Sequence, residues 1–311
     1  MTAHAASPAQ ITVADRSAAL EATFVPALGM VGCSLRHEGE ELLHQGAGPA
    51  AYASAGSTFA LPFLHPWANR VSDWAFALGA RRVTLEPESP FVHRDAATGT
   101  AIHGLLAASP HWRVTDTGPA MLSAELDFGA VPEYMAAFPL PHVVTYTATV
   151  TGTTLKVATS VRAKGEVAVP ISFGFHPYLT LPGSDRRDWR LELPVASRAV
   201  LDERMLPTGE RVELAAGELD GPLGQRTFDT SFPELHGEQP AFVAADNRRR
   251  LTLTHISNYP VAQVYAPAGS QFICFEPMTA PVNALISGDG LRWVQPGERF
   301  DAAFTITVAP A

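Results

Sequence analysis

The sequence is poor in cysteine and in charge. Its 311 residues include 2 cysteines, and charged residues make up only 17% of the chain, with a formal net charge of −9. This acidic balance argues against nucleic-acid binding, which needs a basic face. Cys33 and Cys274 provide neither a disulfide framework nor a zinc-ligand spacing. We therefore expect both thiols to be reduced, as they are in the cytoplasm.

Long hydrophobic runs are also missing. No segment approaches the roughly 18 consecutive apolar residues that a membrane-spanning helix needs. The N-terminus, MTAHAASPAQ, lacks the basic start and the continuous apolar stretch of a secretory signal peptide. These absences predict a cytoplasmic protein with no membrane partner.

Sustained helical periodicity is absent, whereas short strand patterns, interrupted by 24 glycines and 26 prolines, recur along the whole chain. The expected strands are residues 11–14, 20–25, 30–37, 75–78, 82–85, 111–116, 120–128, 143–150, 154–162, 167–174, 189–194, 241–244, 251–257, 262–265, 272–275 and 302–308. Residues 132–138 and 215–219 suggest single helical turns. Residues 201–236 are expected to be irregular and to lie over one face. We predict one all-β domain over residues 1–311, with large antiparallel sheets packed face to face.

The stretch 272–285 combines a buried-strand pattern with one carboxylate. Residues 272–275 are strand formers, and Glu276 follows them directly before Pro277. Because proline cannot donate a ladder hydrogen bond, the strand is expected to end there. Partial burial at a strand end raises the pKa of a carboxyl group, as a general base requires. A structural ion pair with an arginine is the alternative interpretation.

The stretch 169–181 repeats this arrangement. An apolar strand ends at His176, Pro177 stops the ladder, and Tyr178 follows. Histidine titrates nearest to neutrality and is the commonest proton shuttle, and a rigid strand end would hold its ring in one direction. We predict that His176 takes part in proton transfer.

Three further stretches place polar residues among apolar ones. Asn69 and Arg70 follow a loop that contains Trp67, and the arginine could bind hydroxyls or a carboxylate, or form a structural ion pair. His103 precedes a glycine that permits close backbone approach, although it could be a satisfied core histidine. Asp229 lies between two phenylalanines, where it could bind sugar hydroxyls or cap a turn. Polar groups with aromatic neighbours are typical of a small-ligand pocket, here plausibly for a carbohydrate.

Taken in chain order, these motifs resemble the aldose 1-epimerase family, which is also called galactose mutarotase-like. The matching residues are Asn69-Arg70, His103-Gly104, His176-Pro177-Tyr178, Leu206-Pro207-Thr208-Gly209, Asp229, Glu276 and Asn283. The motifs run from roughly residue 60 to residue 285, and the flanking strands fit the same fold. The resemblance implies an antiparallel β-supersandwich that needs no metal and no cofactor.

The resemblance also implies catalytic roles. Glu276 would be the general base that takes the proton from the anomeric hydroxyl, and His176 would be the general acid that protonates the ring oxygen. His103 would polarise the ring oxygen. Arg70 and Asp229 would hold sugar hydroxyls.

Asn69, Tyr178 and Trp67 are expected beside the substrate. The implied activity is interconversion of the α and β anomers of a free hexose, by a monomer or a homodimer whose partner is the sugar.

The natural sugar and some other classes of function stay open. Ala101 stands where many relatives have asparagine, and Leu179-Thr180 replaces a Phe-Asn pair. A hexose 6-phosphate ranks below a free sugar because no lysine or arginine cluster lies beside the motifs. A non-catalytic sugar-binding protein is one alternative. Another is a metal-dependent enzyme with His103, His176 and Glu276 as iron or zinc ligands.

Overall fold

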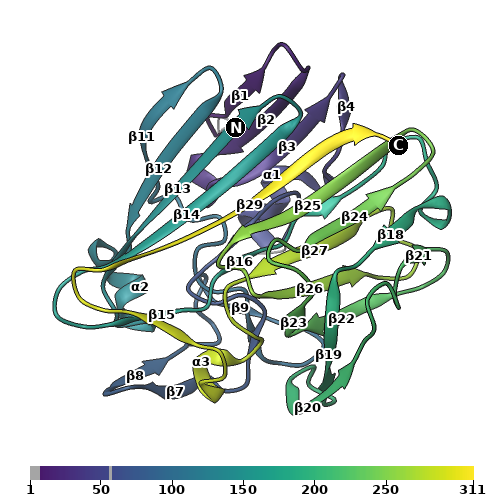
Figure 1. Ribbon diagram of the computed structural model, residues 1–311. Coiled ribbons are helices and arrows are strands. Elements are labelled where there is room, and N and C mark those ends of the chain that lie inside the picture. The colour runs from purple at the N-terminus through teal and green to yellow at the C-terminus, as the bar shows by residue number, and fades with distance from the viewer. Residues whose placement is uncertain (1–7, 56–57) are drawn as a thin grey trace, which may run out of the picture.

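The computed structural model describes residues 8–55 and 58–311 and consists mainly of antiparallel strands in stacked sheets (Figure 1). The largest sheet has nine strands, and β29 crosses its middle between β14 and β25. Its strands in spatial order are β11 (Arg113–Gly118), β12 (Met121–Asp127), β13 (His142–Thr151), β14 (Thr154–Ala163), β29 (Arg299–Pro310), β25 (Arg249–Ser257), β24 (Ala241–Ala245), β18 (Arg190–Glu192) and β21 (Gly221–Pro222).

A six-stranded sheet lies against this one and carries Glu276, Asp229 and Tyr178 of the predicted site. Its strands are β22 (Phe228–Phe232), β26 (Val261–Ala266), β27 (Ile273–Met278), β16 (Gly174–Phe175) and β5 (Phe63–Leu64), with β17 (Tyr178–Leu179) also pairing with β27. β27 therefore lies in the middle of this sheet.

Smaller sheets and short helices surround these two. The other strands are β1 (Ile11–Asp15), β2 (Leu20–Val25), β3 (Val31–His37), β4 (Glu40–Glu41), β6 (Arg70–Val71), β7 (Ala75–Leu78), β8 (Arg81–Thr84), β9 (His93–Arg94), β10 (Ala101–Ile102), β15 (Val169–Ile171), β19 (Val195–Leu201), β20 (Pro207–Glu213), β23 (Glu234–Leu235) and β28 (Arg292–Val294). The helices are α1 (Gly48–Ala55), α2 (Pro132–Ala137) and α3 (Ala284–Ser287), with 3₁₀ turns at Pro26–Leu28, Phe128–Ala130 and Arg186–Asp188.

Aromatic pairs join the two main sheets. The ring of Phe175 lies 4.9 Å from that of Phe304, and the ring of Phe275 lies 5.5 Å from that of Phe242. Since successive strand residues face opposite sides of a sheet, Glu276 projects away from this core. Every residue of β27 is nevertheless buried. Burial on both faces explains the continuous apolar run in the sequence.

The prediction that proline ends this strand is wrong. β27 continues through Pro277 to Met278. On one edge of β27 the backbone pairing stops at Cys274 and resumes only at Met278. Pro277 lies within this interruption, where a residue without an N–H group is tolerated.

Two other predictions about the strands are also wrong. Residues 167–174 form two strands in separate sheets, because the chain leaves β15 to bridge Ser172 with Trp67 before it enters β16. Residues 201–236 contain β20 to β23 rather than only irregular chain. β20 is exposed along most of its length, so it lacks the alternating apolar residues by which a strand is recognised.

Several expectations are confirmed. The antiparallel all-β architecture is present, α2 covers most of the turn predicted at residues 132–138, and Cys33 and Cys274 are buried free thiols. No helix within residues 8–55 and 58–311 is long and apolar enough to cross a membrane.

The core contains histidines that are held neutral. His142 Nδ1 lies 2.7 Å from the carbonyl oxygen of Leu140, and since a carbonyl only accepts, that nitrogen carries the proton. The Nε2 atoms of His142 and His65 lie 2.7 Å apart, so His65 donates to His142. Burial lowers the pKa of His65 well below 6.5, and it lowers that of His142 and of His255 to about 4.

Acidification should therefore destabilise the fold. Below pH 6.5 the unfolded chain binds protons at His65, His142 and His255 that the folded chain does not bind, so the free energy of unfolding falls as the pH falls. Between pH 7 and pH 5.5 we expect a loss of roughly 1 kcal/mol per histidine. Urea unfolding at both pH values tests this, and His255→Phe should reduce the loss by roughly 1 kcal/mol, the contribution of one histidine. Equal stability at the two pH values would contradict the neutral core histidines.

Candidate active site

Strand register brings Glu276 and His176 together. The pairs Tyr178–Cys274 and Gly174–Met278 flank them, which places His176 opposite Glu276 where the backbone pairing is interrupted. His176 Nε2 lies 3.2 Å from Glu276 Oε1, and both side chains are buried. Two ionisable residues far apart in the sequence thus form one buried pair.

A glycine permits this close approach of the strands. A Cβ atom on Gly174 would lie 2.7 Å from the carbonyl oxygen of Pro277 and 2.9 Å from the Cβ of Ala68. Both distances are shorter than ordinary contacts, so a side chain here would push β16 away from β27 and change the separation of His176 from Glu276.

His103 reaches the pair from another sheet. It follows β10 with a left-handed φ of 65°, and its ring centroid lies 5.5 Å from that of His176, nearly perpendicular to it. The next residue, Gly104, bridges His65, and a Cβ on it would lie 2.2 Å from the His65 carbonyl oxygen. Only glycine fits, which explains the His-Gly motif.

Arg70 lies between two carboxylates. Its Nε donates to Asp95 Oδ2 at 2.7 Å, its Nη1 donates to Asn69 Oδ1 at 3.2 Å, and its Nη2 lies 4.0 Å from Asp229 Oδ2. The Arg70 side chain is 11% exposed and that of Asp229 is 36% exposed. Both are therefore accessible to a ligand beside the buried pair.

Register also aligns Asp229 with Glu276 on β27. Asp229 pairs with Tyr265, and Gln263 pairs with Glu276, so these side chains share one face of the sheet. Gln263 Nε2 donates to Asp229 Oδ1 at 2.7 Å. The amide of Gln263 thus fixes the Asp229 carboxylate beside β27.

Burial drives the acid–base pair toward neutral forms. It raises the pKa of Glu276 well above 4.5, the charge of Asp229 raises it further, and Arg70 lowers it. Burial, together with the charge of Arg70, lowers the pKa of His176 to about 3. Burial, followed by the charges of His176 and Arg70, also lowers the pKa of His103 well below 6.5.

Several buried polar atoms around this face lack a hydrogen-bond partner in the described part of the chain. They are Glu276 Oε2, His176 Nδ1, His103 Nδ1 and Gln263 Oε1. Leaving a buried polar group unsatisfied costs about 1–3 kcal/mol, so a cluster of such atoms needs an explanation. A bound molecule with several hydroxyl groups would supply the missing partners.

A sequence model of aldose 1-epimerase matches residues 25–307. The chain belongs to the aldose 1-epimerase family. Its fold is similar to that of a galactose mutarotase-like protein from Clostridium acetobutylicum, with a TM-score of 0.82, 19% identity and coverage of 98% and 99% of the two chains. It is also similar to galactose 1-epimerase from Lactobacillus acidophilus NCFM, with a TM-score of 0.74, 17% identity and coverage of 98% and 100%.

A curated relative of this epimerase-family chain is the uncharacterized protein YihR of Escherichia coli K12. The two sequences are 27% identical over 255 residues, which is 78% of this chain and 77% of YihR. This match adds no substrate to the family assignment.

Of two other predicted site residues, Tyr178 contacts His176, whereas Trp67 lies in the core. The ring of Tyr178 stacks on that of His176 at 4.5 Å, and its hydroxyl is hydrogen-bonded to Thr58. Trp67 is fully buried in the main core, without surface for contact with a ligand. The side-chain oxygen of Asn283 accepts a hydrogen bond from the N–H of Ser72. This bond connects the residue before α3 with the residue after β6, the strand that begins at Arg70.

Three residues that contact or align with the predicted site residues were not predicted from the sequence. They are Gln263, Tyr265 and Asp95. The first two lie inside an ordinary apolar strand, and Asp95 lies in a turn of small polar residues, so no local pattern distinguishes them. Only strand register and the contact with Arg70 reveal them.

Metal binding receives no support from the donor set. No three His, Cys, Asp or Glu side chains among residues 8–55 and 58–311 are grouped so that they could hold a metal ion.

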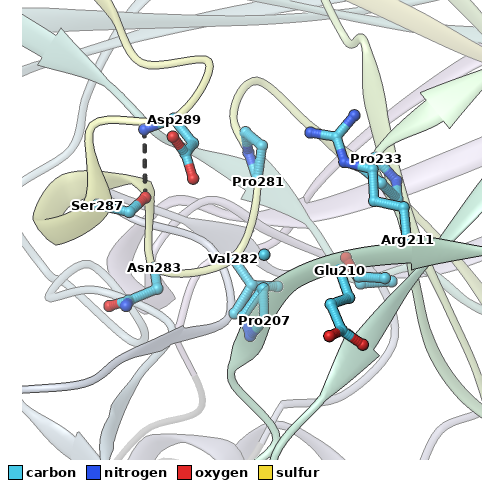
Figure 2. A pocket seen from close by; sticks show the side chains of 12 residues that line it. Pro207, Glu210, Arg211, Pro233, Pro281, Val282, Asn283, Ser287 and Asp289 are labelled. Atoms are coloured by element: carbon cyan, nitrogen blue, oxygen red, sulfur yellow. Dashed lines mark hydrogen bonds between the residues drawn. The ribbon is translucent and has the colours of Figure 1, made fainter.

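A hollow of about 80 Å³ adjoins this face, between β20 and the loop around α3 (Figure 2). Ser231, which lines it, is the register partner of Gln263. Glu210 and Asp289 are carboxylates on its rim, and Arg211 donates to Glu234 at 2.6 Å. Negative charge thus predominates beside the site.

Proposed function

We propose that the protein is an aldose 1-epimerase that interconverts the α and β anomers of a free hexose. The buried pair of Glu276 and His176, with unsatisfied polar atoms beside it, carries this proposal. Anomer exchange needs one group that removes the proton of the anomeric hydroxyl and another that protonates the ring oxygen. It needs no change of oxidation state.

The reaction balances with the protons of the pair. Glu276 takes the proton from O1 while His176 gives a proton to O5, so the C1–O5 bond breaks and an open-chain aldehyde forms. After the C1 end rotates, His176 removes the proton from the O5 hydroxyl and Glu276 returns a proton to O1. General acid–base catalysis of this kind contributes about 10²- to 10⁴-fold.

The pair carries one mobile proton throughout this cycle. In the empty site burial favours neutral Glu276 and neutral His176. The sugar hydroxyl supplies a partner for Glu276 Oε2, and hydrogen bonds to a carboxylate favour its charged form. The proton then moves to His176 along the 3.2 Å contact, which prepares both groups for the first step.

Neighbouring groups hold the sugar. Arg70, Asn69 and Asp229 are proposed to bind hydroxyls, His103 to polarise the ring oxygen, and Tyr178 to support His176 by stacking on it. Trp67 is proposed to act indirectly, because packing of its ring in the core fixes the loop that carries Asn69. The carboxylates on the rim of the hollow would repel a phosphate dianion, which favours a free sugar over a hexose 6-phosphate.

Polarimetry of freshly dissolved α-D-glucose and α-D-galactose tests the activity, with glucose 6-phosphate followed by a coupled assay. We expect accelerated mutarotation of at least one free hexose and weak action on the phosphate. A preference for the phosphate would change the substrate class. Near-stoichiometric zinc or iron in the purified protein would favour the metal-dependent alternative.

The pH dependence follows from the single proton on the pair. A second proton is bound only at low pH, because the pKa of His176 is lowered, so the acid limb of kcat/KM should lie below pH 6.5. Loss of the one mobile proton that Glu276 and His176 share gives an alkaline limb of kcat/KM above pH 4.5, because the pKa of Glu276 is raised. A pH–rate profile with chemistry limiting checks this. Activity that rises continuously with pH would contradict a shared proton.

A further inference from the structure

We propose that Asp95 is a positioning residue, which directs the Arg70 guanidinium toward the sugar and balances its charge. This inference rests on the proposed function. The contact that carries it is the 2.7 Å hydrogen bond from Arg70 Nε to Asp95 Oδ2, in which the two side chains are 11% and 13% exposed. An ion pair shielded to this degree is screened less by salt than a surface pair.

The carboxylate of Asp95 is itself held rigidly. Its Oδ1 accepts from the N–H of Ala97 at 3.0 Å, and its Oδ2 accepts from the Thr98 hydroxyl at 2.9 Å. The backbone of the turn closes through a bond from Asp95 N to the carbonyl of Thr100 at 2.8 Å. A fixed carboxylate, rather than a mobile one, therefore sets the orientation of Arg70.

The same hairpin connects Asp95 with His103. β9 and β10 pair with each other, and β10 also pairs with the strand that begins at Arg70. Asp95 lies in the turn between β9 and β10, and His103 follows β10. The hairpin thus places the holder of Arg70 and a ring beside His176 in one rigid unit.

The contacts of Arg70 leave the N–H groups of Nη2 available to a sugar hydroxyl. Asp95 occupies Nε and Asn69 occupies one hydrogen of Nη1, while Nη2 stays 4.0 Å from Asp229 Oδ2. This separation is too long for a direct hydrogen bond, and a sugar hydroxyl can bridge it. Without the pull of Asp95, Arg70 would close on Asp229 and occupy the place of that hydroxyl.

Charge balance gives Asp95 a second effect. Arg70 lies close enough to influence Glu276, His176 and His103. The other titratable groups around them come from β22, β26, β9, β17 and β27, and they are Asp229, Tyr265, His93, Tyr178 and Cys274. Removing the negative charge of Asp95 would leave more of the charge of Arg70 uncompensated, which stabilises ionised Glu276.

The test compares three variants. Asp95→Asn keeps an oxygen for the N–H of Ala97 but removes the charge. It is expected to raise KM at least tenfold and to move the alkaline limb of kcat/KM down by about half a pH unit. Asp95→Glu keeps the charge but alters the geometry. It should therefore raise KM and leave the pH of the alkaline limb of kcat/KM unchanged. Thr98→Val loosens the turn only, and should change KM less than threefold without moving the limb.

A direct titration separates this inference from the proposed function. The ¹³C carboxyl signal of Glu276, followed by NMR, should show a lower pKa in Asp95→Asn than in the wild type whether or not any sugar is turned over. Unchanged titration of Glu276 in that variant, or an effect equal to that of Thr98→Val, would overturn the role of Asp95. A wild type without activity on any sugar, but with the shifted titration, would reject only the proposed function.

Discussion

Replacing Glu276 with glutamine (Glu276→Gln) is expected to lower kcat for mutarotation by about 10²- to 10⁴-fold, while the sugar dissociation constant stays within about tenfold. The amide fills the same space and can still bond His176 Nε2, which lies 3.2 Å from Oε1 in the wild type. It cannot accept the anomeric proton. Binding contacts survive and proton transfer does not.

The fold should tolerate this change. Burial already favours the neutral form of Glu276, and a neutral amide avoids the cost of a buried charge. Cys274→Ala is a suitable control, because Cys274 is buried on the same strand and has no assigned part in the chemistry. Wild-type kcat in Glu276→Gln would remove Glu276 from the role of base. Weak sugar binding with unchanged kcat would make it a binding residue only.

Gly104→Ala is expected to destabilise the protein by at least about 3 kcal/mol and to abolish turnover. The added methyl would lie 2.2 Å from the carbonyl oxygen and 2.4 Å from the carbonyl carbon of His65. Backbone atoms cannot rotate away as a side chain can, so the turn must move. His103, the preceding residue, moves with it.

Gly269→Ala is the matched control. Gly104 and Gly269 share a φ of 75°, but a Cβ on Gly269 would have no atom within 4 Å. The control should therefore lose only the cost of a left-handed alanine, about 1–2 kcal/mol. Urea unfolding and mutarotase assays of both variants give the comparison. Equal losses would show that φ, and not the contact with His65, explains the glycine.

The sequence indicated the fold class, and singled out Glu276 and His176, for the same physical reason. Buried strands are continuous apolar runs, and an ionisable residue directly after such a run stands out. Glu276 and His176 were both found in this way. The same reasoning failed at Pro277, because the gap in pairing beside β27 is a property of the neighbouring strands and not of the sequence around the proline.

Other parts of the site depend on contacts between distant segments. Gln263 gains its place by register with Glu276, and Asp95 by its bond with Arg70, 25 residues away in sequence. Neither relation has a local signature. Trp67 was predicted beside the sugar because it precedes Asn69 and Arg70, yet its side chain points into the core and is fully buried. β20 was missed because an exposed strand needs no apolar alternation.

Exchange between anomers at equilibrium is the most direct test of the central claim. Two-dimensional ¹H exchange NMR of D-glucose, D-galactose and other free hexoses detects transfer between the α and β anomeric protons without any net reaction. The account predicts exchange peaks with the wild type for at least one sugar, and none above the uncatalysed level with Glu276→Gln. Absence of exchange with every hexose, although saturation transfer shows that they bind, would contradict catalysis and make the protein a sugar-binding member of the family.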